Sequence, residues 1–263
     1  MEHETLIRLG FFLGLFAVFA LAEAALPRRA RVERQWRRWG TNWAISISDA
    51  VLVRLMALAL PVLSVGAALD AAEQGYGLFN RTGWPGWIEG VLAFVILDLA
   101  IWFQHWATHK VPLLWRLHRV HHADRDMDVT TAIRFHPLEI GLSMLWKIAV
   151  IYAIGAPVAA VVIFEVALNG CAMFNHANIA LPAGVDRWLR RIIVTPDMHR
   201  VHHSVDRAEH DTNFGFTLSV WDHLFRTYTA QPGGGHNGMT LGLEWQDDRP
   251  ARLGWSLWLP FRR

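Results

Sequence analysis

Histidines at a repeated spacing are the residues of this chain best suited to chemistry. The pentapeptide HRVHH occurs at residues 118–122 and again at 199–203, 81 residues later. Within each copy the histidines stand at i, i+3 and i+4, and residues at these spacings share one face of a helix. Each copy can therefore direct three imidazoles at a common target.

Two further segments add histidines. His105 and His109 form an HxxxH pair in HWATH, and His176 lies in Asn-His-Ala-Asn at 175–178. Neutral imidazole binds first-row transition metals, and one ion ordinarily takes three or four such ligands. Nine histidines therefore predict two metal ions. The predicted ligands are His105, His109, His118, His121, His122, His176, His199, His202 and His203.

The remaining histidines are isolated in the sequence. An isolated histidine is more often a surface or capping residue than a metal ligand, and we expect that role for His3, His223 and His236. For His136, in Arg-Phe-His-Pro, and for His210, both roles are left open.

The composition indicates a membrane protein. Of the 263 residues 53% are hydrophobic and 14 are tryptophan, and the mean hydropathy is +0.21, which is apolar for a soluble domain of this length. The net charge of +2 does not indicate nucleic-acid binding, because the arginines flank apolar stretches and no nucleic-acid motif accompanies them. A lone cysteine, Cys171, excludes an intrachain disulfide and a four-cysteine iron–sulfur centre.

Apolar segments predict three membrane spans and a helical hairpin, at about 20 residues per crossing. The spans are predicted at residues 6–26, which we interpret as a retained anchor, and at 44–69 and 87–103. Residues 140–174 are too long for one straight span, and a turn near Gly155-Ala156-Pro157 makes them a hairpin. A single crossing there would place the two HRVHH motifs on opposite sides of the bilayer.

Basic residues set the predicted orientation. Arginines crowd residues 27–41, whereas the loop 70–86 carries only Arg81 as a basic residue. The positive-inside rule then places residues 27–41, every histidine cluster and the C-terminus in the cytosol. The predicted fold is an all-α integral membrane bundle with a cytosolic, histidine-rich helical cap.

Three regions follow from this organisation: an N-terminal transmembrane region at 1–90, a catalytic domain at 91–230 and a C-terminal tail at 231–263. The tail mixes arginines with Trp245, Trp255, Trp258 and Phe261, which suits the membrane interface, although it could equally pack on the catalytic domain. The run Gly233-Gly234-Gly235 lacks the strand and helix of a dinucleotide site. No nicotinamide-binding site is therefore expected in this chain, and a separate reductase, ferredoxin or cytochrome is expected to supply any electrons that the metal ions need.

Several motifs, in this order, resemble the fatty acid hydroxylase and sterol desaturase superfamily over residues 95–230. They are HWATH, HRVHH, RFHPLE, FNHANIALP, TPDMHRVHHS, DTNFG and WDHLFRTY. The resemblance implies a membrane-bound oxygenase that uses two irons, dioxygen and two electrons to oxidise a lipid C–H bond. By position, it assigns the nine clustered histidines as iron ligands.

The chain departs from the family pattern at two places. The third histidine region offers only His176, followed by Asn178, so a tenth ligand is left open between His136, Asn178, water and none. The usual Phe-Gly-Thr is Phe225-Arg226-Thr227, which places a bulky cation where glycine is expected and predicts an altered turn or lipid entry.

Few carboxylates lie near the motifs. Asp98 precedes His105 by seven residues, two helical turns, and either orients a ligand imidazole or pairs within the bundle. Asp197, Asp211 and Asp222 are further candidates for orienting ligands.

These observations predict a membrane-bound di-iron lipid hydroxylase or desaturase. Hydroxylation is slightly preferred on the breadth of the family. The alternative from another class is a non-catalytic membrane metal-binding or transport protein, whose ligands would line a path through the bilayer. A bis-histidine haem would use two axial ligands and leave the other histidines unexplained.

Overall fold

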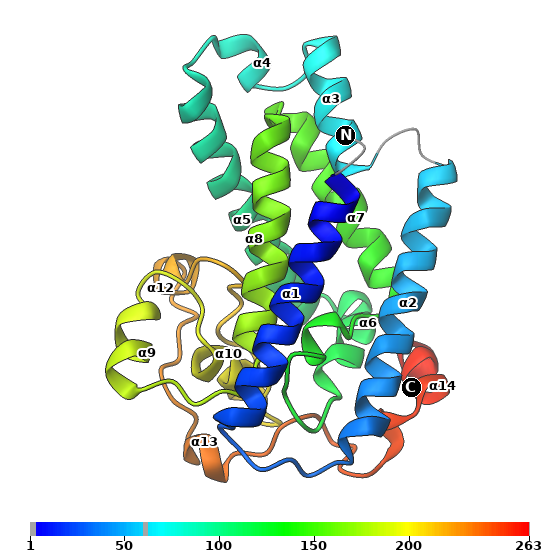
Figure 1. Ribbon diagram of the computed structural model, residues 1–263, viewed down its shortest axis with the longest axis vertical. Helices are drawn as coiled ribbons and strands as arrows, with labels where there is room; N and C mark the ends of the chain where they lie inside the picture. The colour runs from blue at the N-terminus through cyan, green and yellow to red at the C-terminus, as the bar shows by residue number, and fades with distance from the viewer. Residues whose placement is uncertain (1–3, 60–62, 263) are drawn as a thin grey trace.

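The computed structural model describes residues 4–59 and 63–262, and the secondary structure there is helical, with three isolated β-bridges. Five stretches are long and apolar enough to cross a membrane: Arg8–Ala25, Gln35–Thr82, Gly86–Lys110, Pro137–Ile154 and Val158–His176. The long helices run side by side from the upper part of Figure 1 downward, and most of the shorter helices gather at their lower end. The prediction of an all-α membrane bundle, with three spans and a hairpin, is confirmed.

The long helices are α1 (Glu4–Ala25), α2 (Gln35–Ala59), α5 (Gly86–Lys110), α7 (Pro137–Ile154) and α8 (Val158–His176). Two short helices, α3 (Ser64–Gln74) and α4 (Phe79–Thr82), lie at the end of the bundle opposite the cap (Figure 1). The cap contains α6 (Pro112–His122), α9 (Ala183–Leu189), α10 (Pro196–His202), α11 (Arg207–His210), α12 (Val220–Leu224), α13 (Gly235–Gly238) and α14 (Leu253–Trp258). Single 3₁₀ turns occur at Thr131–Ile133, Arg249–Ala251 and Leu259–Phe261.

The predicted hairpin turns where its sequence indicated. Gly155 ends α7 with a φ of +65°, a conformation that costs glycine little. Its Cβ, if present, would lie 2.7 Å from the Tyr76 carbonyl oxygen, so the close approach also requires glycine. Pro157 then caps the start of α8. The chain returns to the cap, and both HRVHH motifs lie at the same end of the bundle.

Two spans differ in length from their predictions. The helix predicted at 44–69 begins nine residues earlier, at Gln35, and ends as α2 at Ala59, and α3 follows as a separate helix. The helix predicted at 87–103 continues to Lys110 and carries HWATH on its last turns. Hydropathy misses both extensions because their polar side chains, such as Arg38, Asn42 and His105, are buried in the cap.

Two buried arginines fasten the cap to the bundle. Arg38 on α2 donates to Asp124 Oδ1 at 2.6 Å and to Asp128 Oδ2 at 2.8 Å. Arg134 donates to Asn42 Oδ1 at 2.7 Å and to the Pro250 carbonyl at 2.9 Å. Both guanidinium groups satisfy several acceptors at once, which offsets the cost of burying a charge.

The C-terminal tail packs on α2 and α6. Trp255 and Leu259 form a cluster with Ile45 and Val120, and Arg119 donates to the Leu259 carbonyl at 2.6 Å. These contacts cover the face of α6 that faces away from its histidines. Trp258 and Phe261 remain exposed, so contact of the tail with a bilayer stays a prediction.

The shared end of the bundle can be tested by labelling. In a Cys171→Ser background, single cysteines replacing Gln35 and Gln231 should react with an impermeant maleimide from one side of the membrane, because both positions are exposed at the cap. A cysteine replacing Glu73, exposed on α3, should react only from the other side. Labelling of Gln35 and Gln231 from opposite sides would contradict the hairpin.

Candidate metal centre

Four helices bring the nine predicted ligands together. α5 supplies His105 and His109, α6 ends in the first HRVHH, α8 ends at His176, and α10 carries the second HRVHH. Proline at the first turn starts both α6 and α10, and Thr195 caps α10 by accepting from the Met198 amide. All nine imidazoles are buried, none more than 4% exposed.

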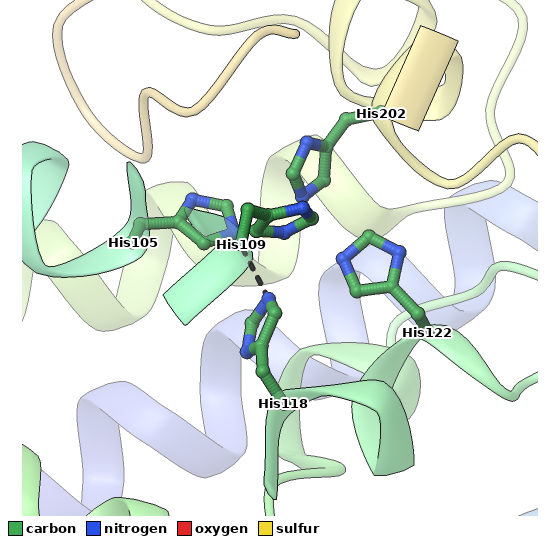
Figure 2. A group of neighbouring side chains, drawn as sticks. All are labelled: His105, His109, His118, His122 and His202. Carbon is green, nitrogen blue, oxygen red and sulfur yellow. Dashed lines mark hydrogen bonds between the residues drawn. The ribbon is translucent and has the colours of Figure 1, made fainter. Parts of the chain in front are cut away.

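The histidines form two groups whose ligand nitrogens lie within 4.8 Å of one another. The five-histidine group, drawn in Figure 2, consists of His105, His109, His118, His122 and His202. The four-histidine group consists of His121, His176, His199 and His203. The groups are adjacent, since the rings of His122 and His203 stack at 4.6 Å between centroids.

The repeated motif is divided between the groups in a reciprocal way. The first HRVHH gives its i and i+4 histidines, His118 and His122, to the five-histidine group and its i+3 histidine to the other. The second gives His199 and His203 to the four-histidine group and its i+3 histidine, His202, to the first. Each motif therefore contributes to both groups, and this explains why the same spacing occurs twice.

Hydrogen bonds fix the orientation of five rings. Four of these imidazoles direct Nδ1 at a backbone carbonyl oxygen, which can only accept, and His118 directs Nδ1 at Glu139, which accepts as a carboxylate; Nδ1 then carries the proton and Nε2 presents a lone pair. The pairs are His105 with Phe214 O at 2.7 Å, His118 with Glu139 Oε1 at 2.6 Å, His121 with Arg134 O at 3.2 Å, His176 with Ala172 O at 2.6 Å, and His202 with Thr212 O at 2.7 Å.

The bare nitrogens then face one another. Nε2 of His105 lies 3.1 Å from Nε2 of His118, the contact drawn in Figure 2, and Nε2 of His121 lies 3.1 Å from Nε2 of His176. No proton is available between either pair, so two lone pairs oppose each other in a site closed to water. A cation bound between them removes this repulsion, and the donor set therefore fits a metal ion in each group.

Burial also keeps the imidazoles of the cap in the form that binds metal. It lowers the pKa of His118 to about 3. Burial, reinforced by the neighbouring imidazoles, holds the pKa of a further five histidines well below its usual value: His121, His122, His199, His202 and His203. Neutral imidazole is the ligating form, so these side chains need lose no proton to accept a metal.

The loop carrying the DTNFG motif orients the five-histidine group. It supplies the carbonyl acceptors of His202 and His105 and places Asp211 Oδ1 3.4 Å from His109 Nδ1. Asp222 holds the loop by accepting from the Phe214 and Gly215 amides, both at 2.9 Å. A Cβ on Gly215 would lie 2.8 Å from Val194 Cγ2, so the tight turn requires glycine.

The aspartate predictions have mixed outcomes. Asp98 accepts from Trp221 Nε1 at 2.8 Å, so it binds the cap helix α12 and does not orient an imidazole of either group. Asp197 binds Arg28 and Arg200. Asp211 lies beside His109, and Asp222 acts indirectly through Phe214. Asp98 lies two helical turns before His105, but it contacts a different segment of the chain. It accepts from the amide of Leu218, which follows 120 residues later.

Neither named candidate for a tenth protein ligand lies in a group. His136 caps α7, where its Nδ1 accepts from the Leu138 amide at 3.2 Å. Asn178 uses both ends of its amide on the Arg29 backbone, at 3.1 and 2.9 Å. The four-histidine group therefore has one protein ligand fewer than its neighbour.

The isolated histidines are distributed differently from expectation. His223 is exposed, as predicted, and His3 lies outside the described residues. His236 is buried, because the segment around it folds beneath Arg29, which donates to its carbonyl. His210 lies against the five-histidine group, in a cluster with His109 and Asp211.

Glu139 is the functional residue that sequence reasoning missed. It belongs to the RFHPLE motif and occupies the first turn of α7, and its carboxylate accepts from His118. The signal available in the sequence was the RFHPLE motif itself, in which His136, rather than Glu139, was considered as a functional residue. Carboxylates that bind the second nitrogen of a ligand histidine raise its basicity and fix its orientation.

Arg226 adopts a φ of +59°, in the left-handed region that favours glycine, and its side chain is exposed. The chain therefore keeps a glycine-like turn at the position where the family has glycine, at a cost of about 1 kcal/mol. An altered turn and an effect on lipid entry both stay predictions.

An apolar cavity of about 400 Å³ adjoins the five-histidine group. His105, His118 and Glu139 lie at one end, and the walls come from α1, α2, α5, α7 and α8, with side chains such as Phe12 and Leu168. This volume lies within the usual range for small-molecule sites.

Together these features define a membrane-embedded helical protein with paired histidine sites suited to metal. The family model for fatty acid hydroxylases matches residues 90–227, more than half of the chain, and the protein belongs to that family. The resemblance inferred from the motifs is confirmed.

The chain is also similar to curated proteins. Ornithine lipid hydroxylase OlsE of Rhizobium tropici is 28% identical over 231 residues, 84% of this chain and 66% of the relative. Alkylglycerol monooxygenase of Homo sapiens is 30% identical over 187 residues, 71% of this chain and 40% of the relative. The Xenopus tropicalis enzyme of that name is 29% identical, and the match covers 56% of this chain and 31% of the relative. The chain thus spans two thirds or less of their length, and no solved structure matches it significantly.

The role of Glu139 can be tested by metal titration. Glu139→Leu should weaken metal binding at the five-histidine group by roughly 10- to 100-fold, the usual effect of losing such a partner. Glu139→Gln should retain most of the affinity, because its amide oxygen still accepts from His118. Competition with a chelator measures both, with Asp98→Asn as a control that should leave affinity unchanged. Equal affinity of Glu139→Leu and the parent protein would contradict this role.

Proposed function

We propose that the protein is an integral membrane di-iron oxygenase that hydroxylates a C–H bond of a lipid, using dioxygen and two electrons. The observation that carries the proposal is the set of opposed, unprotonated imidazole nitrogens in two adjacent buried groups. Such a pair of sites suits two metal ions that act on one substrate. Nine histidines are the proposed ligands.

Iron is the proposed metal. The donors are imidazoles without thiolates, which suits a redox-active first-row ion with open coordination positions. Bound iron would supply the activation of dioxygen. The protein's part is to hold the ligands through Glu139 and the Phe214 and Thr212 carbonyls, and to exclude water from the site by burial.

A lipid is the proposed substrate because the cavity beside His105 lies among membrane-spanning helices. An apolar chain can enter it laterally from the bilayer. The names of the relatives support the same class, since they describe hydroxylation of ornithine lipids and oxygenation of alkylglycerols. Those names also favour hydroxylation over desaturation.

The proposed orientation places the cap and the C-terminus in the cytosol. Arginines of the loop between α1 and α2 lie on the cap side, and the positive-inside rule assigns that side to the cytosol. Electrons would then reach the cap from a soluble or membrane-bound reductase, ferredoxin or cytochrome.

Metal transport is less well supported. A transporter needs ligands along a path through the bilayer, whereas all nine histidines lie at the cap end of the long helices. The charged groups deeper in the bundle, Arg8, Lys147 and Glu165, pair with one another.

Isotope labelling of the product tests the proposal. Iron-loaded protein in nanodiscs of host lipid, supplied with a reductase and ¹⁸O₂, should yield a lipid heavier by one labelled oxygen atom, because the second atom leaves as water. His202→Ala should abolish this product, since it removes a ligand. His223→Ala, a change at an exposed histidine, should not.

Two results would contradict the proposal. One is an unlabelled product, which would exclude dioxygen as the source of the oxygen. The other is unchanged turnover by His202→Ala. A nicotinamide donor without reductase should give no product.

A further inference from the structure

Apolar side chains make up most of the lining of the cavity beside the five-histidine group, together with neutral polar ones such as Gln104, Ser143 and Asn169. Two carboxyl groups also line it, Asp49 on α2 and Glu139 on α7, and both are buried, at 9% and 6% exposure. No lysine or arginine is among the described residues that line the cavity. Carboxylates in a membrane-embedded site are costly unless a partner satisfies them.

Asp49 has an oxygen without a partner. Its Oδ1 is buried and accepts no hydrogen bond from any residue that the structure describes. It belongs to one face of α2, where Ser46, Asp49, Ala50 and Val53 follow at helical spacing and all line the cavity. The carboxyl group therefore faces the cavity, and no ion pair to it is found among the residues that the structure describes.

Glu139 has a second such oxygen. Its Oε1 accepts from His118, but Oε2 is buried and has no partner within the described residues. A carboxyl oxygen without a partner leaves a hydrogen bond unmade in a buried site. Two carboxyl oxygens of different helices thus remain unsatisfied in one cavity, which His105 and His118 also line.

From this arrangement we infer that the cavity binds the polar part of its lipid at the metal end, through a group that donates hydrogen bonds to Asp49 and Glu139. The shared chemistry is a donor, either an ammonium group or a hydroxyl. The inference rests on the proposed function, because it concerns the substrate of that site.

The position of the reacting carbon follows. With the polar group held beside His105 and His118, the C–H bond nearest the metal belongs to the polar end of the lipid. The apolar chain extends away from the cap toward a second cavity of about 630 Å³, whose lining combines apolar side chains with Arg8, Arg54, Lys147 and Glu165. The two cavities share Phe12, Ala50, Val53 and Asn169 in their linings, so a chain can pass from one to the other.

Equilibrium binding without reductant tests the inference apart from turnover. The probes are hexadecylamine, hexadecyl glyceryl ether, and methyl palmitate, which donates no hydrogen bond, added to the full-length, metal-loaded protein and measured by native mass spectrometry. The amine and the ether should bind roughly 10- to 100-fold more tightly than the ester, the range expected for hydrogen bonds to a buried charge.

Variants of Asp49 test whether its side chain accepts the hydrogen bond from the lipid. Asp49→Leu should remove the preference over the ester. Asp49→Asn keeps an acceptor but loses the ionisable group, so it should weaken binding of the amine more than binding of the ether. Asp70→Asn is the matched control, because Asp70 lies on α3 and binds Tyr152 at 2.6 Å, outside both cavities. It should leave all three affinities unchanged.

Equal binding of the ester and the donors by the parent protein would overturn the inference. So would a preference that survives in Asp49→Leu with its metal content intact. If donor-dependent binding is found but no lipid gains oxygen from ¹⁸O₂, the proposed function fails and the binding site stands. If oxygen is incorporated without any dependence on the donor, the proposed function stands and this inference fails.

Discussion

The opposition of unprotonated imidazole nitrogens is the constraint on which the rest of the structure depends. Carbonyl and carboxylate acceptors hold the Nδ1 protons of His105, His118, His121 and His176 outward, which leaves their Nε2 lone pairs facing inward in pairs at 3.1 Å. Without a cation, each pair is repulsive and closed to water. Metal binding and the stability of the cap are therefore coupled.

The surrounding architecture maintains this opposition. Arg38 and Arg134 fasten the cap loops to α2, and the Arg134 carbonyl is itself the acceptor for His121. The DTNFG loop, which Asp222 holds by accepting from the Phe214 amide, orients His105 and His202 of the five-histidine group through its carbonyl oxygens. Because each HRVHH motif contributes to both groups, displacing either α6 or α10 would disturb both sites.

Much of this arrangement could be predicted from spacing alone. Histidines at i, i+3 and i+4 share a helical face, and the need for both HRVHH motifs on one side required the hairpin at Gly155. The division into five and four ligands could not be predicted, since it depends on how α6 and α10 face each other. Contacts between distant segments also decide the roles of two carboxyl groups. Asp98 has helical spacing to His105 but binds Trp221. Glu139 binds His118, which precedes it by 21 residues, so spacing along one helix does not reveal the pair.

Metal analysis with Mössbauer spectroscopy tests the central claim most directly. Detergent-purified protein, prepared anaerobically with ⁵⁷Fe, should hold about two irons per chain in two distinct environments, because one group offers five imidazoles and the other four. Loss of His105 should affect mainly one of the two signals. Well-folded protein that binds no metal, or a single iron in one environment, would contradict the account.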